Sequence, residues 1–336
     1  MKKILGVVLL LAVLVTMFGA CAPVEPAAPQ PAEPAAPEAT TPDTDSSTQD
    51  ANKEYVVAYI LNSVDDWAQT YVNAGTKRCE EYGFKALSMN PESDIQKQID
   101  YVQSAISQKV DMIAIQPIDN AAIAPILKKA NEAGILVNSL YQIEPELGLD
   151  FIVFTTYGQF EAGQIAAEAM VEAIGEKGKV GIIGGNAGAS NTRLRSEGFR
   201  NIIDKYPDIT IVNEIACSWD RSKAMAAADD MITANPDLVG IFSMGDQMAH
   251  GVIESVAGMN KSEQIKIVCV DAGRATQQAV LDGKLAAAVD CPPDWFSEMA
   301  ADVLKMKVDG KPIEQEYIYQ PKAITKDNAD PASAPY

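Results

Sequence analysis

The sequence alternates short apolar runs with longer amphipathic stretches. From residue 55 to residue 140, the apolar runs are 55–61, 84–90, 110–117 and 135–140, and the stretches with helical periodicity are 67–83, 94–108 and 123–134. Apolar runs of this length between helices are typical of strands that are buried on both faces. The pattern therefore predicts a parallel sheet built from right-handed strand–helix–strand units.

The same rhythm starts again at residue 151. A second series of apolar runs, each followed by a helical stretch or a turn, predicts strands at 151–156, 179–185, 209–217, 238–244, 265–271 and 285–291. Two such series in one chain predict two similar doubly wound α/β domains.

The first residues have the pattern of an export signal. Two lysines precede the apolar run 4–18, and two small residues separate that run from Cys21. The run is shorter than the ~20 residues of a membrane span, so we assign 1–20 as a signal peptide. It resembles a bacterial lipobox, with Phe18 where Leu is usual, which implies lipidation of Cys21. The alternative is an ordinary secretory signal with an incidental cysteine.

Composition and charge narrow the class of protein. Residues 21–53 are rich in Pro, Ala and acidic residues, which predicts a disordered tether. The remaining stretch of about 280 residues suffices for two domains. The formal net charge is −19, and Lys and Arg do not cluster with aromatic residues. We therefore expect no nucleic-acid partner, and membrane attachment only through the lipid.

Cysteine and histidine give little sign of metal or redox chemistry. Beyond Cys21, the cysteines are Cys79, Cys217, Cys269 and Cys291, and none forms a C-x-x-C motif. Cys269 lies in an apolar run, where a buried thiol is the default. A disulfide among the four is left open. His250 is the only histidine, so we expect neither a Ser-His-Asp site nor a His-based metal site.

Polar and aromatic residues follow the predicted strands, where ligands bind in doubly wound sheets. The candidates in these positions are Asn62, Asp65, Trp67, Tyr141, Gln142, Arg193, Trp219, Asp246 and Asp271. Aromatic rings stack on C–H faces, carboxylates accept hydrogen bonds and a guanidinium donates them. This combination suits a polyhydroxylated ligand.

Some of these residues have structural alternatives. Asp66 is expected to cap the helix that begins at Trp67, whereas Asp65 is assigned to the ligand. Asp246 and Asp271 could each cap a following helix instead of contacting a ligand. Trp67 and Trp219 each stand beside an aspartate after a predicted strand. Trp295 has no such counterpart, so it is assigned to packing.

Four stretches, in this order, resemble the ribose-type periplasmic sugar-binding proteins, the ligand receptors of ABC importers. They are "PIDNAAIAPILKKANEAGI", "AGASNTRLRSEGF", "ANPDLVGIFSMGDQMAHG" and "VDAGRATQQAVLDGKLAAAV". The resemblance runs from residue 55 to about residue 320. It implies the type I periplasmic binding protein fold: two similar doubly wound parallel-sheet domains joined by a three-crossing hinge. It also implies a sugar or polyol closed between them, an ABC permease as partner, no cofactor and no catalysis.

On this resemblance, the first lobe comprises 54–157 and 291–319, and the second lobe comprises 158–290 and 320–336. The hinge crossings are expected near residues 157–158, 290–291 and 319–320. We expect a monomer, exported and lipid-anchored on the extracytoplasmic side, that captures its ligand by closing the two lobes.

The resemblance also assigns roles within the site. It implies ligand contacts from Asp65 and Trp67 in the first loop, an opposing wall at Trp219 and a last-strand carboxylate at Asp271. Of three arginines close together, Arg193, Arg195 and Arg200, one is expected to face the cleft while the others pair with acids such as Glu197. The resemblance favours Arg193.

Three positions depart from the ribose pattern. Tyr141 and Gln142 stand where an Asp-Arg pair is expected, Gly245 replaces an Asn, and Cys291 replaces a Gln. Since the loss of a hydrogen-bonding partner for a hydroxyl group changes specificity strongly, the resemblance implies a sugar-binding site but does not identify the sugar.

Two rival functions remain open. The aromatic residues and acids could cage a cationic ligand, although Arg193 argues against it. An exported carbohydrate-active enzyme could use paired carboxylates, but no nucleophile motif or closely spaced acid pair supports one.

Overall fold

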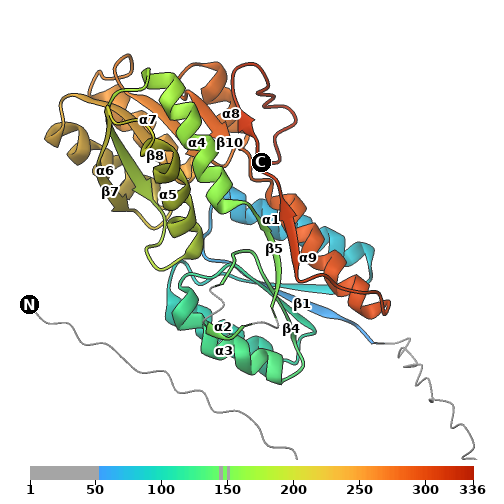
Figure 1. The fold of residues 1–336 in the computed structure, drawn as a ribbon. Coiled ribbons are helices and arrows are strands. Elements are labelled where there is room, and N and C mark those ends of the chain that lie inside the picture. The colour runs from blue at the N-terminus through green and yellow to red at the C-terminus, as the bar shows by residue number, and fades with distance from the viewer. Residues whose placement is uncertain (1–52, 144–146, 150–151) are drawn as a thin grey trace, which may run out of the picture. The chain divides into compact units, whose positions relative to one another are not determined.

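The computed structural model describes residues 53–143, 147–149 and 152–336. The predicted signal peptide, Cys21 and nearly all of the tether lie outside the described residues. The described chain forms two sheets, each flanked by helices (Figure 1). The α/β fold of two similar parallel-sheet lobes is thereby confirmed.

The sheet of the first lobe is entirely parallel, in the order β11-β5-β4-β3-β1-β2. Its strands are β1 (Val56–Ile60), β2 (Lys85–Met89), β3 (Met112–Ile115), β4 (Leu136–Ser139), β5 (Val153–Tyr157) and β11 (Glu316–Tyr319). Its helices are α1 (Asp66–Glu81), α2 (Ile95–Ser107), α3 (Asn120–Glu132) and α9 (Pro293–Val308).

Side chains of β1 alternate between two cores. Val57 and Tyr59 belong to the cluster that includes residues of α1 and α9, whereas Ala58 and Ile60 belong to the one that includes residues of α2 and α3. A strand with helices on both faces needs apolar residues at every position, which explains the unbroken apolar run in the sequence.

The sheet of the second lobe has the order β12-β10-β9-β8-β6-β7 and is parallel except for β12, which is antiparallel to β10. Its strands are β6 (Gly178–Gly184), β7 (Ile209–Ala216), β8 (Leu238–Ser243), β9 (Lys266–Val270), β10 (Ala287–Val289) and β12 (Ala323–Ile324). Its helices are α4 (Gln159–Ile174), α5 (Ser190–Ile203), α6 (Arg221–Ala234), α7 (Asp246–Gly258) and α8 (Arg274–Leu281).

Helices α4 and α5 approach each other closely because glycines face the contact. A Cβ at Gly163 would lie 2.2 Å from the Arg195 carbonyl oxygen, and one at Gly198 would lie 2.0 Å from the Phe160 carbonyl oxygen. This packing fixes the position of α5, the helix that carries the three arginines.

The chain passes between the two sheets three times: after β5, after β10 and after β11. Hydrogen bonds tie the crossings together, since the Tyr319 hydroxyl donates to Asp290 Oδ2 (2.7 Å) and the Gly158 N–H donates to the Tyr319 carbonyl (3.3 Å). The hinge is therefore a bonded unit of three neighbouring segments.

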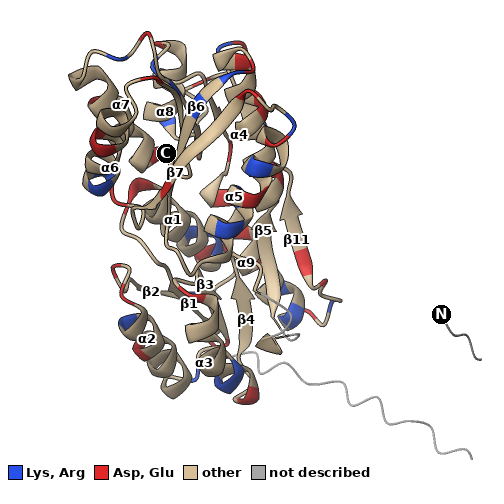
Figure 2. Ribbon diagram, turned by 60° about the vertical axis from the view of Figure 1, so that its left-hand side comes forward, with Lys and Arg blue, Asp and Glu red and all other residues tan. Residues whose placement is uncertain are grey.

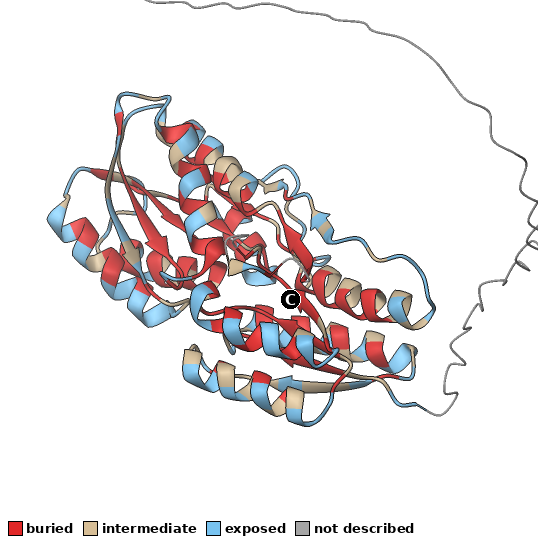
Figure 3. Ribbon diagram, turned by 60° about the horizontal axis from the view of Figure 1, so that its bottom comes forward, coloured by how far each residue is buried: buried red, intermediate tan, exposed pale blue. Residues whose placement is uncertain are grey.

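Burial follows the layers, with strands and the inner faces of helices buried and the outer faces exposed (Figure 3). Acidic and basic residues are interspersed along the helices of both lobes (Figure 2). Cys79, Cys217, Cys269 and Cys291 are buried free thiols, as predicted for Cys269. Trp295 packs against Phe296 and Tyr319, also as predicted. Among the described helices, none has the length and apolarity needed to cross a membrane.

Candidate ligand-binding site

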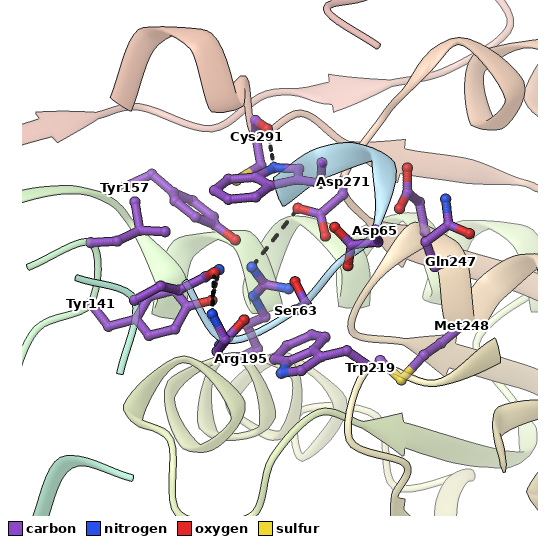
Figure 4. A pocket seen from close by; sticks show the side chains of 15 residues that line it. Ser63, Asp65, Tyr141, Tyr157, Arg195, Trp219, Gln247, Met248, Asp271 and Cys291 are labelled. Carbon is purple, nitrogen blue, oxygen red and sulfur yellow. Dashed lines mark hydrogen bonds and ion pairs between the residues drawn. The ribbon is translucent and has the colours of Figure 1, made fainter. Parts of the chain in front are cut away.

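A pocket lies where the carboxyl ends of both sheets meet (Figure 4). We call it the ligand pocket. Its lining residues are Asn62, Ser63, Asp65, Trp67, Gln116, Leu140, Tyr141, Tyr157, Arg195, Trp219, Asp246, Gln247, Met248, Asp271 and Cys291. Most follow the last residue of a strand within a few positions, as the topology of open α/β sheets requires. In this conformation the cavity is narrow, with a volume of about 30 Å³.

On the first lobe, buried polar side chains form a short chain of hydrogen bonds. Gln116, which directly follows β3, donates through Nε2 to the Tyr141 hydroxyl (2.7 Å) and accepts from the Asn62 N–H (3.3 Å). These bonds connect the ends of β1, β3 and β4. They hold the Tyr141 ring at the pocket, and burial raises the pKa of its phenol.

The three candidates that follow β1, in its loop and at the start of α1, all line the pocket: Asn62, Asp65 and Trp67. Asp65 lines the pocket and is also the N-cap of α1, accepting a hydrogen bond from the Ala68 N–H (2.8 Å). The expectation that Asp66 provides the cap was therefore wrong: Asp66 is the first residue of the helix. Trp67 lines the pocket, but its Nε1 donates to the Cys291 carbonyl (2.9 Å) and its ring stacks on Tyr71.

Arg195 lies at the centre of the pocket, between the rings of two aromatic residues (Figure 4). Its guanidinium carbon is 5.3 Å from the Tyr157 ring centroid and 5.6 Å from that of Trp219. It donates to Gln159 Oε1 (2.9 Å) and to the Met244 carbonyl, and its Nη2 is 3.9 Å from Asp271 Oδ1. With only 3% of its side chain exposed, Arg195 is a fixed cationic donor.

Trp219 is held against the second lobe by two glycines. A Cβ at Gly185 would lie 2.1 Å from its ring, and one at Gly245 would lie 3.2 Å away. The backbone of Trp219 (φ 61°) is left-handed, as is that of Asp271 (φ 71°). Such strain in residues other than glycine costs about 1–3 kcal/mol each and is concentrated at functional sites.

One buried carboxyl group, that of Asp246, and two partly buried ones, those of Asp65 and Asp271, share the pocket with one guanidinium. Burial raises the pKa values of Asp65 and Asp246, and their mutual repulsion adds to the shift of Asp65. The pKa of Asp271 is raised to about 7, chiefly by burial; the Arg195 charge opposes this shift and the Asp246 charge adds to it. The pocket therefore has more potential negative than positive charge.

Several hydrogen-bond donors at the pocket are unused. The Asn62 Nδ2, the Tyr157 hydroxyl and the Trp219 Nε1 are buried without a hydrogen-bond partner in the described part of the chain. An unpaired buried donor costs about 1–3 kcal/mol, and all three belong to residues that line one cavity, which suits an oxygen-rich ligand.

With Cys291, which stands where the resemblance implies a ligand-binding Gln, ten site residues were predicted; the structure places eight of them at the pocket and two outside it. Arg193 is half exposed and pairs with Glu197 (3.2 Å), while Arg200 pairs with Glu214 (2.7 Å). The choice of Arg193 was therefore wrong, and Arg195 is the arginine that faces the cleft. Gln142 is also outside, because its Nε2 points to Glu316 (3.4 Å) on β11.

Sequence reasoning missed Gln116 and did not assign Tyr157 to the site. Both stand at the end of a strand, so the rule that selected the other candidates could have found them. Four other lining residues were not predicted, but each lies within three positions of a predicted site residue. They are Ser63, Leu140, Gln247 and Met248.

Comparison with known proteins gives concordant matches. A model of the periplasmic binding protein domain matches residues 57–312. The ribose import binding protein of Bacillus subtilis (strain 168) is 26% identical over 264 residues, which cover 78% of this chain and 85% of that protein.

Solved structures agree in fold. An ABC transporter solute-binding protein from Agrobacterium vitis with bound D-fucose has a TM-score of 0.78 and 26% identity, covering 82% of this chain and 97% of that one. Another from Agrobacterium vitis, bound to α-D-tagatopyranose, has a TM-score of 0.77 and 25% identity, covering 84% and 98%.

Proposed function

Since the chain belongs to the periplasmic binding protein family, we propose that it is the extracytoplasmic receptor of an ABC importer. It captures a monosaccharide or related polyol between its lobes and delivers it to the membrane permease. The relatives described above are import or solute-binding proteins, and two of them hold sugars. In this proposal the pocket binds and does not catalyse.

The observation that carries the proposal is the matched set of hydrogen-bonding groups in the ligand pocket. Asn62, Tyr157 and Trp219, which carry unpaired donors, line the same cavity as Asp65, Asp246 and Asp271. A sugar hydroxyl donates one hydrogen bond and accepts others, so it can satisfy both kinds of group at once. The Trp219 ring offers a flat face for the C–H side of a sugar.

Lobe closure is the mechanism we propose for capture. The cavity of about 30 Å³ is far smaller than the ~300–1,000 Å³ of small-molecule sites, so a sugar enters only when the lobes or the lining side chains move apart. The lobes also touch beside the pocket, where the Asn120 N–H donates to the Gly188 carbonyl (3.4 Å). A ligand that contacts both lobes stabilises the closed state because only that state makes all the contacts.

The membrane side of the proposal rests on sequence alone. Lipidation of Cys21 and the tether 21–53 would hold the receptor at the outer face of the cytoplasmic membrane, as a monomer close to its permease.

A thermal-shift screen of residues 53–336 tests the function. We expect stabilisation by at least one pentose, hexose or sugar alcohol and none by amines. Trp219→Ala should abolish the shift, while Trp295→Ala, which changes a tryptophan outside the pocket, should keep it. Stabilisation by cationic metabolites alone, or turnover of a glycoside, would replace the sugar receptor with one of the rival functions.

A further inference from the structure

Tyr336 contacts Asp246, one of the residues that line the ligand pocket. Its ring does not line the pocket; it lines a neighbouring cavity, together with Asp66, His250 and Arg274, that shares Asp246 and Gln247 with the ligand pocket. Asp246 therefore stands between the sugar site and Tyr336.

The Tyr336 hydroxyl donates to Asp246 Oδ2 (2.9 Å). The Thr276 hydroxyl (3.3 Å) and the Gly273 N–H (3.4 Å) donate to the same oxygen. All three bonds use Oδ2, and the phenol makes the shortest of them. Together they hold the Asp246 carboxylate in one orientation.

The loop before α8 is shaped to hold Tyr336 in place. The Arg274 N–H donates to the Tyr336 carbonyl. The ring lies directly on Gly273, where a Cβ would be 2.3 Å from a ring carbon. Any larger residue at position 273 would displace the ring, so this glycine and Tyr336 form a fitted pair.

We propose that Tyr336 is a positioning residue of the sugar site: its phenol fixes the orientation of the Asp246 carboxylate and keeps it a hydrogen-bond acceptor. This role rests on the proposed function. Burial raises the pKa of Asp246, and the hydrogen bond from Tyr336 is the largest influence opposing that rise. Without the phenol, more of Asp246 would carry a proton and would accept less strongly from a sugar hydroxyl.

Other ionisable groups around Asp246 do not replace this contact. Asp65 before α1 and Asp271 after β9 are acids that repel it, and Cys269 is a buried thiol. Arg195 bonds to Gln159 and Met244, and His250 bonds to Thr276 (3.2 Å).

The test compares sugar affinity of Tyr336→Phe with the wild type by calorimetry, using the sugar found in the screen. We expect Kd to rise about tenfold at the acidic end of the pH range tested, which corresponds to one lost charge-assisted hydrogen bond, and the ratio of the two Kd values to shrink as the pH rises and Asp246 ionises again. A purely structural loss would raise Kd equally at every pH.

Tyr82→Phe is the matched control, because that phenol also donates to a carboxylate, Asp302 (2.6 Å), but outside the pocket. Its Kd should stay within twofold of the wild type. Thr276→Val removes a second donor from the same oxygen and serves if Tyr336→Phe folds poorly; its Kd should shift in the same direction.

An unchanged Kd in Tyr336→Phe, or a rise that is independent of pH, would overturn the role of Tyr336 while leaving the receptor function intact. A wild-type protein that binds no neutral polyol would overturn both.

Discussion

Arg195 is the residue whose role changed most between sequence and structure. Its guanidinium is held by Gln159 Oε1 and the Met244 carbonyl, between two aromatic rings. A lysine has one compact charge and cannot make this planar set of contacts. We expect Arg195→Lys to raise the ligand Kd by about tenfold to a hundredfold, through loss of one or two charge-assisted hydrogen bonds. Calorimetric titration measures the change.

Arg193→Lys is the matched control for this experiment. Arg193 lies on the same helix but is half exposed and paired with Glu197, an arrangement worth little on a protein surface. Its Kd should stay within twofold of the wild type. If Arg193→Lys bound the ligand more weakly while Arg195→Lys bound it normally, Arg193 would be the arginine that contacts the ligand, as first predicted.

The sequence could not separate these two arginines. Positions 193 and 195 differ by about 200° around a helix, so they face opposite sides, but deciding which side faces the cleft requires the rotation of α5. That rotation is set by tertiary packing at Gly163 and Gly198, which no local pattern reports. By contrast, Asp271 directly follows β9 and Asn62 lies two residues after β1, so their placement at the carboxyl edge of a sheet does not depend on how a helix is rotated.

At the scale of elements, α1 is joined to the hinge by Trp67. Its Nε1 donates to the Cys291 carbonyl at the second crossing, and its ring packs between Tyr71 and Phe296. Trp67→Phe leaves that buried carbonyl without its donor, so we expect the free energy of unfolding to fall by about 1–3 kcal/mol. Urea denaturation followed by circular dichroism gives the value.

Trp295→Phe provides the comparison, since that ring is only partly buried and packs on Phe296 and Tyr319. Trp295→Phe should lower the free energy of unfolding by less than Trp67→Phe does. Equal losses in the two variants would show that the hydrogen bond to Cys291 contributes nothing.

Elements with a strong apolar pattern, such as β1 and β9, could be predicted from the sequence. Elements without one, such as β11, could not. The runs that became β1 and β9 are buried on both faces, so burial is visible in the sequence itself. β11 lies at the sheet edge and alternates exposed with half-buried residues, so it carries no apolar run. α9 follows the last predicted strand, and its docking on α1 becomes evident only in the structure.

For the whole molecule, the pocket is a source of instability as well as of binding. Three carboxyl groups, buried or partly buried, share the pocket with one guanidinium, and the pKa of Asp271 is raised from 3.8 to about 7. A carboxyl group whose pKa is higher in the folded than in the unfolded chain binds more protons when folded. Its contribution to stability therefore falls as pH rises from about 4 to 7 and stays lost above that range.

Asp271→Asn removes this loss of stability at high pH, because the neutral amide has no charge to bury. Asp65 and Asp246 remain to balance the charge of Arg195. We expect the variant and the wild type to have similar melting temperatures near pH 4, and the variant to be more stable by at least about 1 kcal/mol near pH 8. Asp208→Asn, at an exposed turn, should match the wild type at both pH values.

Ligand binding should change in the opposite direction to stability. If Asp271 is kept in a strained, left-handed backbone because it binds a sugar, the more stable Asp271→Asn protein should bind sugar at least about tenfold more weakly. Calorimetry on the same samples measures this affinity. A variant that is less stable near pH 8, or one that is more stable and binds as tightly as the wild type, would show that the buried charge is not maintained for the ligand.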